Sequence, residues 1–473
     1  MLLAVSGRYG YHRDELYFLA AGRHLAWGYP DQPPFTPLVA RAVSALAGDS
    51  LVALRTPSAL AAGAMALLTG LLARELGGGR AAQVLAAASV AASAVVLLTG
   101  HLLSTSTFDL LAWTALTLLV VRVLRTGHDR LWLLAGVVAG VGLLNKTLVA
   151  FLLAGLAGGL LVSGPRRVLR SGWLWAGVGL ALVIWAPNLW WQAQNGWPQL
   201  DLSRAIAEGS SGTSASRVAF VPYQLVLIGP ALVPVWVAGL VRLLRAPDVR
   251  FARSLAWAYV LLLVVFVLSG GKPYYLCGLY PVLLAAGAKP VTEWASRRVA
   301  RPPLVYGAVG VSAVIAATLM LPVLPVTWLR HTPIPAVNYD GNETVGWPQL
   351  AATVASAYRA LPDDERARAV VLTSNYGQAG AVDRFGPALG LPRAYSGHNG
   401  YGYWGPPPAG SEPVLAVGVD EAQLRRLFGS VEAVARIDNR VQLDNDEQGR
   451  TVWLCRSQRG SWSTDWPKLR RLG

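Results

Sequence analysis

The chain has 473 residues, of which 53% are hydrophobic and only 14% are charged. Soluble domains are about 25% charged, so this composition excludes an ordinary soluble enzyme. The formal net charge of +15 falls in short intervals between apolar runs, which is typical of a polytopic membrane protein rather than of a nucleic-acid-binding protein.

The chain begins with a short apolar segment, Met1 to Ser6. A membrane span needs roughly 20 apolar residues, so we interpret this segment as the end of a first transmembrane helix whose upstream half is missing from the sequence. The alternative is a short interfacial start. A long polar interval at residues 7–50 follows, and it carries Arg13, Arg23, His24, Asp31 and Gln32 besides the acidic pair Asp14 and Glu15.

Ten further apolar runs follow this interval. Backbone groups in lipid must pair within their own segment, so we expect each run to be a helix. With the first helix they predict about eleven transmembrane helices. The runs lie at about residues 51–73, 81–100, 106–124, 131–145, 147–163, 172–192, 219–241, 254–270, 274–290 and 303–325.

Basic residues gather in alternate connections between these runs. Lys and Arg favour cytoplasmic loops, so the other connections, including residues 7–50, 192–217 and everything after residue 325, are predicted to be extracytoplasmic. The basic residues that set this orientation are Arg74, Arg80, Arg122, Arg125, Arg130, Arg166, Arg167, Arg170, Arg242, Arg245, Arg250, Arg253, Lys289, Arg297, Arg298 and Arg301.

The composition changes to that of a soluble module from about Thr327. The pattern predicts strands at residues 369–373, 413–419, 431–437 and 451–455 and helices at 377–389 and 420–428. Residues 444–449 lack the full spacing of a calcium loop and are expected to form a solvated hairpin turn. The predicted fold is therefore a polytopic α-helical membrane domain, residues 1–325, followed by an extracytoplasmic α/β domain, residues 326–473.

Polar side chains collect at the outer ends of the predicted spans. Ionisable groups at membrane depth are costly unless they face a cavity or one another, so this pattern predicts a polar cleft that opens outward. Its residues are Arg55, His101, Asp109, Asn145, Lys146, Asn188, Gln192, Lys272, Tyr274 and Tyr275. For the two lysines the alternative is a charge that reaches the interface from a helix end, and for Asp109 it is a helix cap after Ser104–Thr107.

The acidic pair in the first outer loop, Asp14 and Glu15, supplies the candidate chemistry. A positioned carboxylate can accept the proton of an acceptor as that acceptor attacks the anomeric carbon of a sugar. We assign this role to Asp14, with Glu15 orienting Asp14 or the acceptor. A leaving phosphate needs cations to hold it, and the candidates are Lys146, Lys272, Arg55 and Arg204. The alternative for the acidic pair is helix capping.

The sequence indicates neither a metal site nor a nucleotide cofactor. Its six histidines are scattered without the spacing of metal ligands, and no phosphate-binding P-loop or dinucleotide fingerprint is found. We therefore expect no cofactor, and a sugar donor linked to a lipid.

Several segments resemble bacterial membrane glycosyltransferases of the C-type superfamily, which includes protein O-mannosyltransferases and the aminoarabinose transferase of lipid A (families 39 and 83). The segments are residues 10–17 around Asp14 and Glu15, 28–34 with Asp31-Gln32-Pro33, Asn145-Lys146, 194–198, and 271–275 with Lys272, Tyr274 and Tyr275; in the outer domain they are 376–380, 396–399 and 404–406.

This resemblance implies a polyprenyl-phosphate sugar donor, transfer with inversion and a catalytic Asp14. It adds Arg13, Asp31 and Gln32 to the cleft, with Tyr376, His398 and Asn399 of the outer domain as candidate acceptor-side residues. One departure is that the aminoarabinose-transferase type has a lysine where this chain has Gln32, which transfers the predicted phosphate contact to Lys146 or Lys272.

The sequence thus predicts a multi-pass protein of the cytoplasmic membrane that glycosylates a protein, lipid or polysaccharide of the cell envelope. The alternatives are a transporter or lipid flippase, and a non-catalytic scaffold for envelope assembly. Transporters tend to have repeated halves with ionisable residues near the membrane midplane, whereas the charges of this chain lie at the predicted outer ends.

Overall fold

The computed structural model describes residues 1–208 and 216–473. The chain divides into two compact units: unit 1 consists of Met1–Ala4, Gln32–Thr36 and Arg55–Leu321, and unit 2 consists of Val5–Asp31, Pro37–Leu54 and Pro322–Gly473. Most of the first polar interval therefore groups with the C-terminal region. The functional domains predicted from the sequence, 1–325 and 326–473, stay a prediction.

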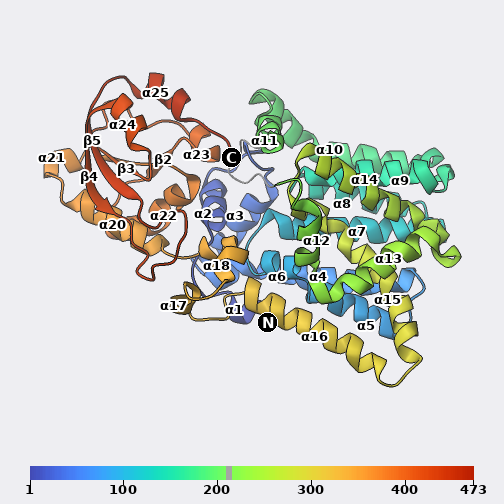
Figure 1. Cartoon of the computed structure of the whole chain (residues 1–473). Coiled ribbons are helices and arrows are strands. Elements are labelled where there is room, and N and C mark those ends of the chain that lie inside the picture. The colour runs from blue at the N-terminus through green and yellow to red at the C-terminus, as the bar shows by residue number, and fades with distance from the viewer. Residues whose placement is uncertain (209–215) are drawn as a thin grey trace. The chain divides into compact units, whose positions relative to one another are not determined.

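Unit 1 is helical throughout its described residues (Figure 1). Its helices, some of which begin in or continue into unit 2, are α1 (Leu2–Val5), α4 (Leu51–Glu75), α5 (Arg80–Ala91), α6 (Ala94–Gly100), α7 (Thr105–Thr126), α8 (Leu131–Leu143), α9 (Leu148–Ser163), η1 (Arg166–Arg170), α10 (Gly172–Gln194), α11 (Pro198–Ala207), α12 (Phe220–Ile228), η2 (Pro230–Leu232), α13 (Val233–Arg245), η3 (Pro247–Ala252), α14 (Arg253–Ser269), η4 (Pro273–Leu279), α15 (Tyr280–Ser296) and α16 (Arg301–Met320).

All ten apolar runs after the first polar interval are largely helical, as predicted. Within the described part of the chain, five helices are long and apolar enough to cross a membrane, or up to seven if each bent pair is one span. The pairs are α5 with α6, bent by 59°, and α12 with α13, bent by 88° around Gly229 and Pro230. The fold is thus of the helical membrane type, while the count of eleven spans stays a prediction. The predicted outer interval 192–217 includes residues 209–215, which lie outside the described residues.

Small residues allow the helices of unit 1 to approach closely. A Cβ atom at Gly239 in α13 would overlap the carbonyl oxygen of Leu283 in α15, and one at Gly287 would overlap that of Val235. The same relation holds between α8 and α10 at Gly136 and Gly177. Such backbone contacts are typical of helix pairs in membranes, where association depends on close packing.

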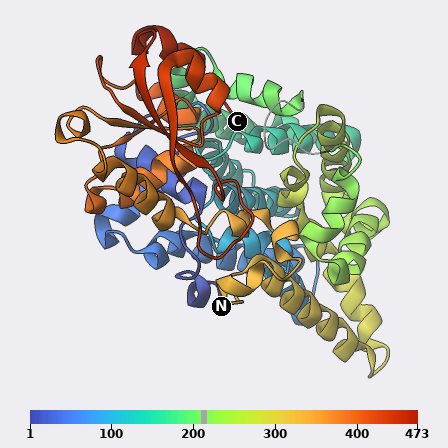
Figure 2. The same ribbon diagram turned by 60° about the vertical axis from the view of Figure 1, so that its left-hand side comes forward.

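Unit 2 contains a five-stranded sheet in the order β2-β1-β3-β5-β4. Its C-terminal strands are drawn in red in Figure 2. The strand β1 (Val370–Thr373) pairs in parallel with β2 (Ala394–Ser396) and β3 (Val414–Val417), and β5 (Thr451–Gln458) pairs antiparallel with β3 and β4 (Phe428–Arg436). Four of these strands were predicted. The sequence analysis missed β2, because three residues are too few to produce a pattern.

The helices of unit 2 are α2 (Arg13–Arg23), α3 (Phe35–Ala47), α17 (Val326–Leu329), α18 (Ile334–Val337), α19 (Tyr339–Asn342), α20 (Trp347–Arg359), α21 (Asp363–Arg366), α22 (Tyr376–Phe385), η5 (Pro387–Leu389), α23 (Asn399–Tyr403), α24 (Glu421–Leu427) and α25 (Trp462–Leu469). The helix α2, from the first polar interval, packs on α22. Gly377 and Gly380 permit this contact, since a Cβ atom at these positions would lie 2.9 Å from the Cβ of Arg13 and 2.8 Å from that of Leu16.

One turn of unit 2 differs from the solvated turn that the sequence predicted. Residues 444–449 do connect the antiparallel strands β4 and β5, but they are not simply solvated, because Glu447 is buried. The Glu447 carboxylate accepts hydrogen bonds from Asn375, at 3.0 Å, and from Gln378. The connection is therefore tied to α22 beside Tyr376.

Candidate active site

The acidic pair lies in the first turn of α2. His12 caps this helix by accepting a hydrogen bond from the backbone N–H of Asp14, and the carboxylate of Glu15 accepts one from the backbone N–H of His12 at 2.8 Å. Glu15 is wholly buried. The hydrogen bond of Glu15 completes a capping box, as the capping alternative for the acidic pair expects. This bond holds Glu15, the residue next to Asp14, in place.

Asp14 keeps an accessible carboxylate. Its Oδ1 accepts a hydrogen bond of 2.7 Å from the hydroxyl of Tyr376, while its Oδ2 lies 3.9 Å from His12 Nδ1, and its side chain is 43% exposed. Burial raises the pKa of Tyr376 well above its usual value, and the nearby Asp14 charge raises it further. The Tyr376 hydroxyl therefore stays protonated and acts as a donor to Asp14.

Arg13 lies beside the same tyrosine. Its guanidinium carbon is 5.9 Å from the centre of the Tyr376 ring, and its Nη1 is 3.6 Å from Glu343 and 3.4 Å from Asp446. Arg13 is therefore held in place by contacts from three separate segments of unit 2.

The second predicted carboxylate of the loop, Asp31, has both oxygens engaged. Oδ1 accepts from Tyr17 at 2.8 Å and Oδ2 from the side-chain amide of Asn399 at 3.1 Å. Tyr17 in turn accepts from the backbone N–H of Gly400 at 2.9 Å. Burial of the carboxylate raises the pKa of Asp31 to about 7, so Asp31 is neutral in part near neutral pH.

His398 completes this set of side chains. Its ring centre lies 4.9 Å from that of Tyr376, and neither ring nitrogen has a hydrogen-bond partner among the described residues. Burial, assisted by Arg471 and Arg13, lowers the pKa of His398 to about 3. The imidazole is therefore neutral.

We call these residues the acid cluster: Arg13, Asp14, Tyr17, Asp31, Tyr376, His398 and Asn399. All lie in unit 2. The structure thus brings together three residues that the sequence placed in the first loop with three that it placed in the outer domain. Gln32 belongs to unit 1, where it is buried.

A second group of predicted residues comes together in unit 1. The ammonium of Lys146 donates to Ser106 Oγ at 3.0 Å and lies 4.9 Å and 5.8 Å from the ring centres of Tyr274 and Tyr275. Asp109 lies three residues after Ser106 in α7, so these two side chains share one face of the helix. Asn145, almost wholly buried, accepts from Thr36 and donates to the carbonyl of Thr105, both at 2.8 Å. We call Ser106, Asp109, Asn145, Lys146, Tyr274 and Tyr275 the lysine cluster.

The capping alternative for Asp109 is wrong. Ser104 is the residue that caps α7, by accepting from the backbone N–H of Ser106. Asp109 lies within the helix, where it accepts from the indole of Trp113 at 3.1 Å.

Four further predicted residues belong to neither named cluster. Lys272 precedes η4, two and three residues before the tyrosines of the lysine cluster. Arg55 is wholly buried in α4, and the ring of His101 lies 3.0 Å from the carbonyl of Leu98. Arg204 has a side chain that is 71% exposed and is paired with Asp201 at 3.2 Å.

Sequence reasoning missed Tyr17, which links Asp31 to Gly400. A signal was present, because Tyr17 lies three residues after Asp14 and side chains at this spacing share one face of a helix. Within residues 1–208 and 216–473, no three His, Cys, Asp or Glu side chains gather as metal ligands would.

Residues 31–191 match the family described as dolichyl-phosphate-mannose-protein mannosyltransferase. This range includes Asp31 and the residues Ser106 to Lys146 of the lysine cluster. Among curated protein sequences no match is found.

Solved structures match over nearly the whole chain. ArnT from Cupriavidus metallidurans bound to undecaprenyl phosphate is 17% identical, with 96% of this chain and 95% of that chain covered and a TM-score of 0.60. The structure of the same protein in the apo state is 16% identical, with the same two coverages and a TM-score of 0.61. The chain has an ArnT-like fold. The arabinofuranosyltransferase AftD from Mycobacteria is 14% identical, with 97% of this chain and 41% of that chain covered and a TM-score of 0.51. The predicted resemblance to C-type membrane glycosyltransferases is confirmed.

Proposed function

We propose that this protein is an integral membrane glycosyltransferase that moves one sugar from a polyprenyl-phosphate donor to an envelope acceptor, with inversion at the anomeric carbon. The match to the mannosyltransferase family supports a lipid-linked donor, as does the ArnT-like fold, since ArnT was crystallised with undecaprenyl phosphate. The same findings do not favour a transporter or a scaffold.

We further place the reaction on the outer side of the cytoplasmic membrane. This placement depends on the alternation of arginine-rich connections along the sequence. It makes residues 1–325, with eleven spans and the loop 7–50, the transferase domain, and residues 326–473 an extracytoplasmic domain on the acceptor side.

Asp14 is the proposed general base, and the observation that carries this assignment is the difference among the three loop carboxylates. Glu15 is buried and caps α2, and both oxygens of Asp31 accept hydrogen bonds. Asp14 alone of these three combines a fixed position, through Tyr376, with an accessible oxygen.

In the proposed reaction, the acceptor hydroxyl gives its proton to Asp14 while its oxygen forms a bond to the anomeric carbon. The bond from that carbon to the phosphate oxygen breaks, and polyprenyl phosphate leaves with the electron pair. A phosphate leaving group needs no acid, but it gains from a cation. We assign this contact to Lys146, with Lys272 as the second candidate.

The test is sugar transfer from radiolabelled polyprenyl-phosphate sugars in membranes that contain the full chain. Asp14→Asn keeps the size of the side chain and its contact with Tyr376 but removes the base, so we expect transfer to fall by about 10² to 10⁴-fold. Asp364→Asn, an exposed residue of α21, is the matched control and should transfer at the wild-type rate.

Two outcomes would contradict the proposal at different levels. Undiminished transfer by Asp14→Asn would remove Asp14 from the mechanism and leave the transferase intact. Failure of the wild-type chain to use any labelled polyprenyl-phosphate hexose or pentose would contradict the function itself.

A further inference from the structure

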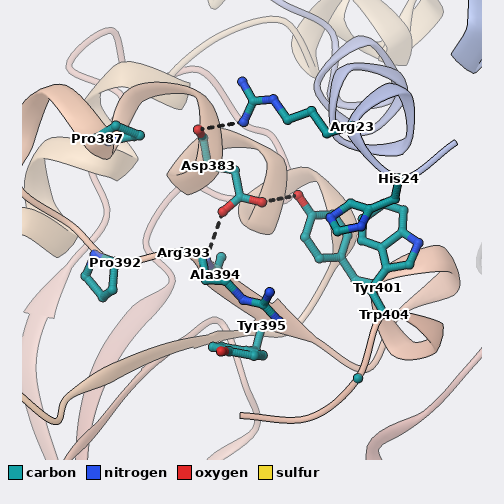
Figure 3. A pocket seen from close by; sticks show the side chains of 11 residues that line it. Arg23, His24, Asp383, Pro387, Pro392, Arg393, Ala394, Tyr395, Tyr401 and Trp404 are labelled. Atoms are coloured by element: carbon teal, nitrogen blue, oxygen red, sulfur yellow. Dashed lines mark hydrogen bonds between the residues drawn. The ribbon is translucent and has the colours of Figure 1, made fainter. Parts of the chain in front are cut away.

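Unit 2 contains a pocket of about 220 Å³ whose lining includes Tyr401 and Trp404 (Figure 3). It is lined by residues of α2, α22, η5, β2 and α23 and by the segments that follow α2, η5 and α23. Pockets for drug-sized ligands have about 300–1,000 Å³, so this pocket has room for one small group.

One wall of the pocket is aromatic. The ring of His24 stacks on that of Trp404, with centres 4.4 Å apart and planes at 16°, and Trp404 packs on Tyr401 at 4.6 Å. Burial and the nearby Arg393 lower the pKa of His24. The imidazole is therefore uncharged at neutral pH and presents a flat surface.

The other lining groups carry a net positive charge. The guanidinium of Arg393 lies 4.5 Å from the centre of the Tyr395 ring, and that of Arg23 donates to the backbone carbonyl of Asp383 at 3.5 Å. The Asp383 carboxylate is already used, since it accepts from the backbone N–H of Ala394 and from the Tyr401 hydroxyl, each at 2.8 Å. Two guanidinium groups thus face one internally satisfied carboxylate.

We propose that this pocket binds a single anionic sugar ring, that is, a sugar that carries a phosphate or a carboxylate. Guanidinium groups match the geometry of both anions. Aromatic side chains such as Trp and Tyr provide a broad apolar surface together with a polar edge, which suits a ring with one apolar face and hydroxyl groups around it. A neutral sugar would offer no negative charge to Arg23 and Arg393.

The pocket shares a wall with the acid cluster. The ring centre of Tyr17 lies 6.4 Å from that of Tyr401 and 6.1 Å from that of Trp404, and Tyr17 donates to Asp31. In the transferase proposed above, the pocket would hold an anionic sugar of the acceptor, and this role rests on the proposed function. The binding of an anionic sugar by the pocket does not depend on that function.

The test is isothermal titration calorimetry on the full chain in detergent micelles, with glucose 1-phosphate, glucuronic acid, glucose and inorganic phosphate as probes. We expect at least one of the two anionic sugars to bind more tightly than glucose and inorganic phosphate. Arg393 is exposed, so Arg393→Gln should fold, and it should weaken that binding by about tenfold or more. Arg393→Lys should retain part of the affinity. Arg425→Gln, on the exposed face of α24, should have no effect.

A preference for glucose 1-phosphate would identify a phosphorylated sugar as the ligand, and a preference for glucuronic acid would identify a uronic acid. Equal binding of glucose, equal binding of inorganic phosphate, or unchanged affinity in Arg393→Gln would overturn the proposal. Asp14→Asn should bind the probe normally, so a loss of transfer with intact binding separates a failure of the catalytic proposal from a failure of this one.

Discussion

The acid cluster and the lysine cluster are assembled in opposite ways. In the acid cluster, Asp14 and Asp31 are held by partners 362 and 368 residues away in the sequence. In the lysine cluster, Asn145 and Lys146 bond to residues 40 positions away, across α7 and the turn before α9. The comparison teaches that the proposed base is positioned by the C-terminal region, whereas the proposed phosphate contact is built within a single group of helices.

If Asp14 is the base and Lys146 holds the donor phosphate, substitutions in the two clusters should change different kinetic constants. Lys146→Met keeps the length of the side chain and removes its charge. We expect the KM for the polyprenyl-phosphate donor to rise by about 10 to 100-fold, since a charge-assisted contact is worth about 1.5–3 kcal/mol, with little change in kcat. The measurement is initial rate against donor concentration.

Lys289→Met is the control for Lys146, because Lys289 lies in α15 and pairs with Asp248 outside the lysine cluster. An unchanged KM in Lys146→Met would favour a lysine that merely reaches the membrane interface. A fall in kcat alone would assign Lys146 to the chemical step and abolish the contrast with Asp14.

A smaller effect tests the environment of Asp31. Its pKa is raised to about 7 in the folded state, above the value of about 3.9 for an unfolded chain. Between these values the folded protein holds a proton that the unfolded chain releases, so the contribution of Asp31 to stability declines as pH rises from about 4 to 7, by up to about 1.4 kcal/mol per pH unit.

Asp31→Asn removes this titration, and comparison with the wild type isolates it from other groups. The Tm of the wild type minus that of the variant should therefore be larger at pH 4.5 than at pH 7.5, measured by thermal unfolding in detergent. If the Tm of the wild type minus that of the variant is the same at both pH values, the Asp31 carboxylate is better solvated than its contacts indicate.

The smallest effect concerns Tyr376. Tyr376→Phe retains the ring beside His398 and Tyr17 but loses the donor to Asp14, so we expect kcat/KM to fall by about 2 to 10-fold, the worth of one ordinary hydrogen bond. The measurement is the initial rate of transfer against acceptor concentration at one pH, together with thermal unfolding of the same variant.

Tyr358→Phe removes a hydroxyl that donates to the carbonyl of Arg366 and serves as the control for Tyr376. A lower rate accompanied by a lower Tm in Tyr376→Phe, but not in Tyr358→Phe, would mean that Tyr376 supports the packing of α22 and does not act through Asp14.

Much of the fold could be predicted from the sequence, because the length and composition of an apolar run are local properties of the chain. The sequence predicted the ten apolar runs after residue 50 as helical and four of the five strands, but it did not predict the helix α11, which lies in the predicted outer interval 192–217. It did not predict the 88° bend at Gly229 and Pro230, since a glycine and a proline in an apolar run mark a break but do not fix its angle.

The candidate site was only partly predictable, for a physical reason. Asp14, Tyr376 and Asn399 could be selected as candidates from their chemistry and from the resemblance. The hydrogen bond between Tyr376 and Asp14 depends on the contact between α2 and α22, which no local sequence pattern predicts. The same applies to the pocket beside Trp404: Arg23 and His24 were visible as polar loop residues, whereas Asp383 and Arg393 have no distinguishing spacing.

The close contact of α2 with Gly377 and Gly380 has a consequence for protein engineering. A chimera that exchanges the C-terminal region at residue 325 would graft a foreign α22 against a native α2 and so separate the proposed base from its tyrosine. A chimera that tests acceptor preference should therefore carry residues 5–31 and 37–54 together with residues 322–473, so that all of unit 2 comes from one parent.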